Sequence, residues 1–295
     1  MITAPGRLLL IAFFLLGRNP VTGQFTAAQI DSLKKELAVA KEDTLKVEIL
    51  RHLGNETGYT DPAGALRYAM EGFELSKKLR FARGEGNLAY LTAILHEDLG
   101  NSTLADSFLA IAASRFTELN LPGQQAKVEH ARGVQAYKKG NYWLAADFFT
   151  KTVKIFEEIR DSSSALIAYQ SLTALLGQVK NHEKAIELSK KAIKLAEARK
   201  DTLSVHYSLQ VLVTNLVYAE RMDEASTHLN SLKKIAESTS DLSLGADIFS
   251  TLATYYYRDK QFAEAVRFSK KAVETAQQMG NQYQVANHLN TLGQS

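Results

Sequence analysis

The chain contains 295 residues, of which 45% are hydrophobic, with four prolines, no cysteine, and 35 Lys and Arg against 32 Asp and Glu. The absence of cysteine excludes disulfides, thiol catalysis and zinc–thiolate sites. The nearly neutral charge argues against nucleic-acid binding, because proteins that neutralise many phosphates carry a basic excess or a basic stripe.

The N-terminal segment combines a positive charge with a short apolar run. Residues 8–16 read LLLIAFFLL, and helix-breaking residues follow from Gly17 to Pro20. The run has about half of the roughly 20 residues that a helix needs to cross a bilayer. We therefore predict a signal peptide over residues 1–23, cleaved after Gly23, and an exported, periplasmic protein. Retention of the segment as an uncleaved anchor is the alternative. No later stretch is apolar enough to span a membrane.

Two amphipathic segments come next. Residues 24–45 are predicted to form an N-terminal capping helix, because apolar side chains recur at helical spacing at Ile30, Leu33, Leu37 and Ala40. The following segment places Leu45, Ile49 and Leu53 on one helix face. A further helix is expected to begin at Pro62, since proline is well tolerated in the first helical turn.

A small residue then returns every 40 positions and opens a similar amphipathic run each time, at Ala65, Ala105, Ala145, Ala185, Ala225 and Ala265. Self-similarity at such a period predicts a stacked repeat protein. In the third repeat we expect a first helix (helix A) over about 124–138, a turn at Gly140-Asn141 and a second helix (helix B) over about 142–159. A hairpin of two amphipathic helices must bury its apolar faces against neighbouring hairpins.

This period divides the rest of the chain into six repeats and the beginning of a seventh. The predicted repeats are 46–85, 86–125, 126–165, 166–205, 206–245 and 246–285, with an incomplete repeat at 286–295. The chain stops at Ser295, inside the expected helix A of the seventh repeat. We expect either a fragment of a longer protein or a last helix that itself forms the cap.

Small and large residues occupy set positions in these hairpins, as at Gly133, Tyr142, Ala145, Phe149 and Thr152 of the third repeat. The pattern resembles the tetratricopeptide repeat (TPR) family over roughly residues 46–295. The resemblance implies an all-α, right-handed superhelical solenoid of antiparallel helix hairpins. The period of 40 departs from the family's usual value of about 34, and the proline that commonly ends helix B is missing. We expect longer helices to accommodate the additional residues.

In this family the inner helices line a concave groove, and the resemblance transfers three lines of groove positions to this chain. The first line is Tyr90, His130, Gln170, Gln210, Ser250 and Asn290. The second is Asn87, Lys127, Ile167, Tyr207, Asp247 and Asn287, and the third is Glu97, Tyr137, Gly177, Val217 and Tyr257. A polar surface with interspersed aromatics suits an extended protein or peptide ligand. The alternative is that the tyrosines pack between repeats.

The sequence contains none of three common catalytic motifs: the phosphate-binding GxxxxGK(S/T) loop, the GxSxG nucleophile elbow and the zinc-binding HExxH pair. The seven histidines show no pairing at a spacing of four residues. We therefore predict a protein without catalytic activity, cofactor or metal. A catalytic solenoid remains a third possibility beside the two binding functions given next.

Two phrases, ALRYAMEGFELSKKL and AIELSKKAIKLAEARKD, resemble the exported repeat regions that precede the membrane segment of some bacterial sensor kinases and regulators. This resemblance implies a protein-interaction module that serves as the extracytoplasmic input region of a signalling protein. The alternative is a self-contained periplasmic scaffold or assembly factor.

Overall fold

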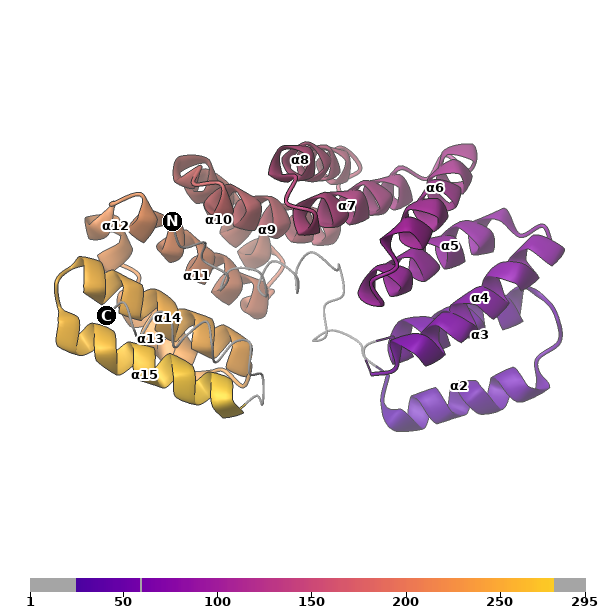
Figure 1. Ribbon diagram of the computed structural model, residues 1–295, viewed down its shortest axis with the longest axis horizontal. Helices are drawn as coiled ribbons and strands as arrows, with labels where there is room; N and C mark the ends of the chain where they lie inside the picture. The colour runs from indigo at the N-terminus through magenta and orange to yellow at the C-terminus, as the bar shows by residue number, and fades with distance from the viewer. Residues whose placement is uncertain (1–24, 59, 279–295) are drawn as a thin grey trace. The chain divides into compact units, whose positions relative to one another are not determined.

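The computed structural model describes residues 25–58 and 60–278, and within these ranges every regular element is an α-helix (Figure 1). The helices are α2 Ala27–Val39, α3 Thr44–Thr57, α4 Pro62–Lys78, α5 Ala82–Asp98, α6 Ser102–Glu118, α7 Pro122–Lys138, α8 Tyr142–Glu158, α9 Ser162–Gln178, α10 His182–Ala198, α11 Thr202–Tyr218, α12 Met222–Ser226, α13 Leu229–Ser238, α14 Leu242–Arg258 and α15 Phe262–Gln278. The predicted signal peptide, Asn290 and the partial seventh repeat lie outside the described residues.

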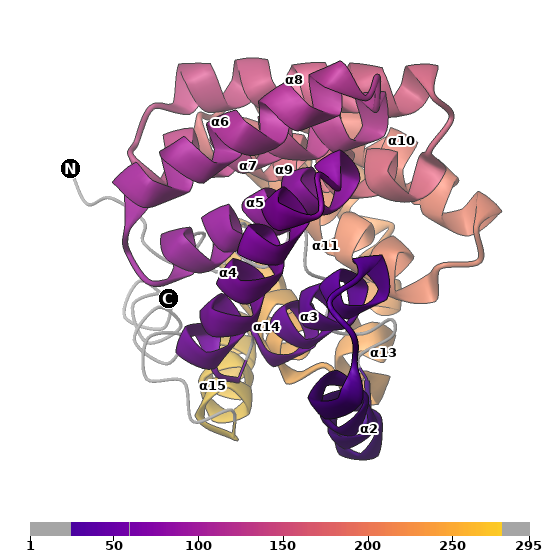
Figure 2. The same ribbon diagram turned by 90° about the vertical axis from the view of Figure 1, so that its right-hand side faces the viewer.

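The 40-residue period appears directly in the helix boundaries. From α5 onward the A helices begin 40 residues apart, at Ala82, Pro122, Ser162, Thr202 and Leu242. Most helices contain 17 residues, and connections of three residues join them, so the longer helices do account for the long period. In the third repeat, α7 and α8 agree with the expected helices A and B to within two residues. Figures 1 and 2 show successive helices lying side by side within each hairpin.

Most connections between the 17-residue helices reverse the chain through a residue with a positive φ. After α7, Gly140 adopts φ 76°, its N–H donates to the carbonyl of Tyr137 at 2.9 Å, and the N–H of Asn141 donates to that of Ala136 at 2.8 Å. This pattern caps the last carbonyls of the helix. Residues other than glycine take the same position elsewhere, namely Arg80, Asn120, Arg160, Lys180, Lys200, Glu220 and Lys260. Most of these are basic, which suits the negative end of a helix dipole.

The six periodic alanines are fully buried, each with 0% exposure. They lie where helix B approaches helix A, and the small residues on the facing helix show how close that approach is. A Cβ built on Gly133 of α7 would lie 2.5 Å from Cε1 of Phe149 in α8, and one built on Gly54 would lie 3.2 Å from the carbonyl oxygen of Ala65. Both contacts place a glycine where the two helices of a hairpin approach closely.

Contacts divide the described residues into two compact units, one ending at Asp161 and the other beginning at Ser162. We call them the N-terminal and C-terminal units. The N-terminal unit has a core that includes Leu50, Leu88 and Phe116, and the C-terminal unit has a core that includes Leu216 and Phe268. Each core joins several successive hairpins, as expected for repeats that are stabilised by their neighbours.

The N-terminal helix α2 lies against α3 and has no fully buried residue. Its start carries a capping box between Thr26 and Gln29. Just before it, the ring of Phe25 stacks on His52, and its N–H donates to Glu56 at 3.1 Å. The segment therefore packs against α3 through partly buried side chains.

The fifth repeat differs from the others because its helix B is broken into α12 and α13. The sequence pattern predicts one continuous run here. At the break, the hydroxyl of Ser226 donates to the carbonyl of Asp223, and that of Thr227 to the carbonyl of Glu224, each at 2.7 Å. Such side-chain bonds compete with the helical backbone ladder. None of the described helices is long and apolar enough to cross a membrane.

Candidate interaction surface

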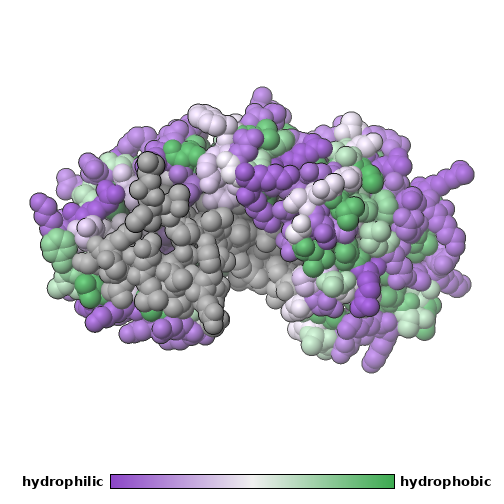
Figure 3. Space-filling view, viewed as in Figure 1, coloured by the Kyte–Doolittle hydropathy of each residue, from purple (hydrophilic) through white to green (hydrophobic). Residues whose placement is uncertain are grey.

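In the N-terminal unit, the A helices α5 and α7 and the buried Leu109 of α6 line a small hollow. Most of the lining is apolar, and the residues around it are Tyr90, Ala93, Ile94, Glu97, Leu109, Ala131, Val134 and Gln135. The hollow exists because Ala93 and Ala131 have small side chains, and longer side chains at these positions would fill it. A hollow of this kind suits an apolar group with polar atoms at its edge. Figure 3 shows polar and apolar residues interspersed over the visible surface of this unit.

The polar edge of the hollow is built around Glu97. Its carboxylate accepts a hydrogen bond from Nε2 of Gln135 at 3.2 Å and pairs with Nζ of Lys138 at 3.4 Å. Both donors come from α7, while Glu97 belongs to the last turn of α5. The cluster therefore joins the two A helices and holds the charged groups in place beside the apolar lining.

Two of the predicted groove residues in this unit are packed inside it. His130 is 6% exposed and its ring lies 5.2 Å from that of Phe149. Burial lowers the pKa of His130 to about 4, so the ring is neutral at physiological pH. Tyr137 is 3% exposed and packs against Tyr142, with ring centroids 5.4 Å apart. Both ring contacts lie within one hairpin, between α7 and the start or middle of α8.

The other predicted residues of the N-terminal unit are at least partly accessible. Tyr90 is half-buried at the hollow, and Lys127 is exposed on α7. The hollow thus joins Tyr90 of the first predicted line with Glu97 of the third.

In the C-terminal unit, the A helices α11 and α14 meet through a network of polar side chains. Nε2 of Gln210 donates to Oγ1 of Thr214 at 3.1 Å and to Oγ1 of Thr251 at 2.8 Å. The two threonine hydroxyls lie 2.9 Å apart. The network connects adjacent repeats, because Thr251 belongs to α14 and the other two residues belong to α11.

A second contact between these helices involves Tyr207 and two aspartates. The hydroxyl of Tyr207 donates to Asp241, and the same carboxylate caps α14 by accepting from the N–H of Leu244 at 3.0 Å. Burial, followed by the hydrogen bond to Asp241, raises the pKa of Tyr207. Burial and the charge of Asp241 also raise the pKa of Asp247 to about 8.

The remaining predicted residues of this unit differ in accessibility. Gln170 is buried in α9, Ser250 is half-buried in α14, and Tyr257 is 43% exposed, with its ring edge-on to that of Phe262 at 5.8 Å. The charge of ionised Asp247 helps to raise the pKa of Tyr207, its neighbour in the second predicted line. The structure pairs Gln210 with Thr251, however, one residue beyond the predicted Ser250.

Sequence reasoning missed Asp241 and Thr251 as parts of this surface. An aspartate directly before a helix predicts the capping role that Asp241 has, but its position does not predict a place on this surface. Its second contact, with Tyr207, joins residues 34 positions apart. Within the described residues no group of His, Asp and Glu side chains is arranged to hold a metal ion. The N-terminal unit thus offers one apolar hollow with polar groups at its edge, and the C-terminal unit offers hydrogen-bonding groups and two carboxyl groups.

Comparisons with known proteins relate the chain to solved structures. No protein-family model matches the sequence, and no curated protein matches it. Among solved structures, a signal transduction ATPase with numerous domains and a TPR sensor, from Pyrococcus horikoshii, is similar with a TM-score of 0.70 and 17% identity, covering 88% of this chain and 41% of that one. The chain therefore spans about two-fifths of the length of that protein.

Two further structures show the same kind of fold. Aspartyl phosphate phosphatase F from Bacillus subtilis is similar with a TM-score of 0.63 and 14% identity, covering 99% of this chain and 79% of that one. BtubC from P. vanneervenii gives a TM-score of 0.52 at 15% identity, covering 87% and 94% of the two chains. At these identities the similarity concerns the fold. The all-α, TPR-like repeat architecture is confirmed.

Proposed function

We propose that the chain is a non-catalytic protein-interaction module that binds an extended peptide segment on the exposed faces of its A helices. The observation that carries this proposal is the hollow between α5 and α7, where apolar walls adjoin the polar cluster of Glu97 and Gln135. An apolar pocket with a few fixed polar groups is typical of peptide and ligand recognition. The TPR-like fold supports the proposal, because a rigid stack of hairpins presents such surfaces without large rearrangement.

The biological setting belongs to the same proposal. The apolar run of residues 8–16 supports export to the periplasm, and the two sequence phrases resembling sensor-kinase input regions support a role as an extracytoplasmic sensor. A self-contained periplasmic scaffold is the second candidate. What the gene encodes after residue 295 separates the two, because a membrane helix with an output domain is required for the first. Cell fractionation with N-terminal sequencing tests export and cleavage after Gly23.

Capture of partners by the mature chain tests the binding function. We expect Lys127→Glu and Tyr257→Ala, introduced together, to reduce capture several-fold, since both residues are exposed on A helices. Tyr137 is a poor choice for this test because its burial makes truncation a packing defect. Trp143→Ala is the matched control, because this residue is 88% exposed on the B helix α8. Equal capture by all three proteins would exclude the A-helix faces as the binding surface.

A further inference from the structure

The polar network between α11 and α14 leaves one buried acceptor unpaired. Thr214 Oγ1 donates to the carbonyl of Gln210, and Thr251 Oγ1 donates to the carbonyl of Asp247, each at 3.0 Å. Each hydroxyl has a single proton, so both are available to Gln210 mainly as acceptors. This orients the Gln210 carboxamide with Nε2 toward the hydroxyls. Its Oε1 is buried and has no hydrogen-bond partner.

Asp247 lies on the same face of α14 between two contacts with α11. Tyr207 and Gln210 are three residues apart on α11 and therefore project from one side of that helix. Tyr207 bonds Asp241 at the start of α14, and Gln210 bonds Thr251 farther along. Asp247, one turn before Thr251, is half-buried between these contacts. Its charge acts on the Tyr207 hydroxyl.

No basic side chain among the described residues forms an ion pair with Asp241 or Asp247. The ion pairs of the C-terminal unit lie elsewhere, for example between Lys190 and Glu224 and between Lys271 and Glu237. The pKa of Asp247 is raised to about 8 by burial and by Asp241, as expected for a carboxyl group that lacks a counter-charge. Gln210 contributes an unpaired acceptor on α11, and Asp247 on α14 is a carboxyl group that a nearby cation would shift toward its ionised form. Together they favour a ligand that brings both hydrogen-bond donors and positive charge.

We propose that this face of α11 and α14 is a subsite for a basic side chain, arginine or lysine, of the peptide partner, with Asp247 and Gln210 Oε1 as its acceptors. This inference rests on the proposed peptide-binding function and specifies one residue class of the ligand. The guanidinium group fits best, because its several donors reach a carboxylate and a carboxamide oxygen together. Asp241 remains engaged with Tyr207 and contributes its charge rather than a direct contact.

Direct titration tests the subsite with two probes of nearly the same shape, one cationic and one neutral. The probes are the short peptides acetyl-Gly-Arg-Gly-amide and its citrulline counterpart, titrated into the mature chain by calorimetry at low salt. We expect the arginine peptide to bind at least about tenfold more tightly, because a hydrogen bond between charged groups is stronger than one between neutral groups. Asp247→Asn should remove that difference. Asp259→Asn, an equal charge change at the exposed end of α14, should leave it in place.

Equal affinity for the two peptides in the wild-type chain would overturn the subsite without reference to any variant. Loss of the difference in both Asp variants would also overturn it, since that result indicates general electrostatic attraction. Equally tight binding of spermidine would overturn the assignment to a peptide side chain. Partner capture separates these outcomes from failure of the proposed function: a partner that is still captured by the wild-type chain leaves peptide binding intact while the subsite fails.

Discussion

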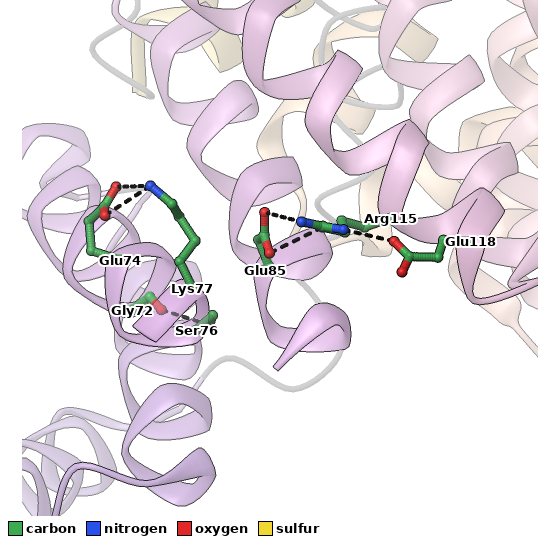
Figure 4. A network of polar contacts seen from close by, with 7 residues as sticks. All are labelled: Gly72, Glu74, Ser76, Lys77, Glu85, Arg115 and Glu118. Carbon is green, nitrogen blue, oxygen red and sulfur yellow. Dashed lines mark hydrogen bonds and ion pairs between the residues drawn. The ribbon is translucent and has the colours of Figure 1, made fainter. Parts of the chain in front are cut away.

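The guanidinium of Arg115 holds the carboxylate of Glu85 through two nitrogens, with Nε–Oε2 and Nη2–Oε1 distances of 3.1 Å each (Figure 4). Glu85 lies in the first turn of α5 and Arg115 near the end of α6, so the pair joins the two helices of one hairpin. Glu85 is 8% exposed. Arg115 also donates to Glu118 at 2.8 Å.

We expect Arg115→Met to lower the free energy of unfolding by on the order of 1–2 kcal/mol, because it leaves the buried Glu85 carboxylate without its donor. Urea denaturation measures the change. Lys77→Met is the matched control, since it removes an exposed i,i+3 pair with Glu74 and should alter stability by less than about 0.5 kcal/mol. Equal losses in the two variants would show that the Glu85–Arg115 pair has no special role.

Ala185→Leu should lower the free energy of unfolding by about 1–3 kcal/mol through overpacking. Ala185 has 0% exposure at the point where helix B of the fourth repeat approaches its neighbours. Thermal denaturation compares this variant with Ala263→Leu, which makes the same change at an exposed position of α15. An unchanged melting temperature for Ala185→Leu would contradict the assigned repeat register.

The positive φ at the helix ends predicts an unusual response to glycine. Lys180 adopts φ 62°, a conformation that disfavours a residue with a Cβ by roughly 1–2 kcal/mol. We expect Lys180→Gly to raise stability by up to about 1 kcal/mol, because added freedom in the unfolded chain offsets part of the gain. Lys191→Gly, inside the exposed face of α10, should lower stability by about 1 kcal/mol. Chemical denaturation measures the change in unfolding free energy for both variants. A gain at Lys180 together with a loss at Lys191 would show that the backbone conformation at the helix end determines whether glycine stabilises the protein.

The lowered pKa of the buried His130 predicts that the folded protein loses stability in acid. Burial lowers its pKa to about 4, so between this value and the unfolded value of about 6.5 the unfolded chain binds a proton that the folded chain does not. Stability therefore falls as the pH falls through this range. The contribution of His130 between pH 7 and pH 5 is about 2 kcal/mol.

His130→Gln removes this titration while keeping a polar side chain of similar size. Denaturation of the wild-type and variant chains at pH 7 and pH 5 gives the difference directly. The variant should lose about 2 kcal/mol less than the wild type over this interval. Parallel losses in the two proteins would show that His130 is accessible to protons in the folded state.

The local sequence pattern alone determined the repeat architecture of this protein. The 40-residue spacing of alanines predicts six hairpins, and the described structure confirms helices A and B in the third repeat and the burial of all six alanines. Spacing of this kind is informative because each alanine marks a close helix contact, and close contacts tolerate only small residues. The polar connections likewise follow from short-range turn preferences.

Only the tertiary structure decided how deep each polar residue lies and which partner it meets. The periodic pattern places His130, Tyr137 and Gln210 toward the inner side of their helices, yet all three are buried. The contacts of Tyr207 with Asp241 and of Gln210 with Thr251 join residues 34 and 41 positions apart. The burial of a side chain and the partner that it meets depend on the angle at which helices cross and on the direction of the side chain. The spacing of residues in the sequence does not specify either. The repeat pattern therefore determines the scaffold, while packing between neighbouring A helices selects the side chains left for a ligand.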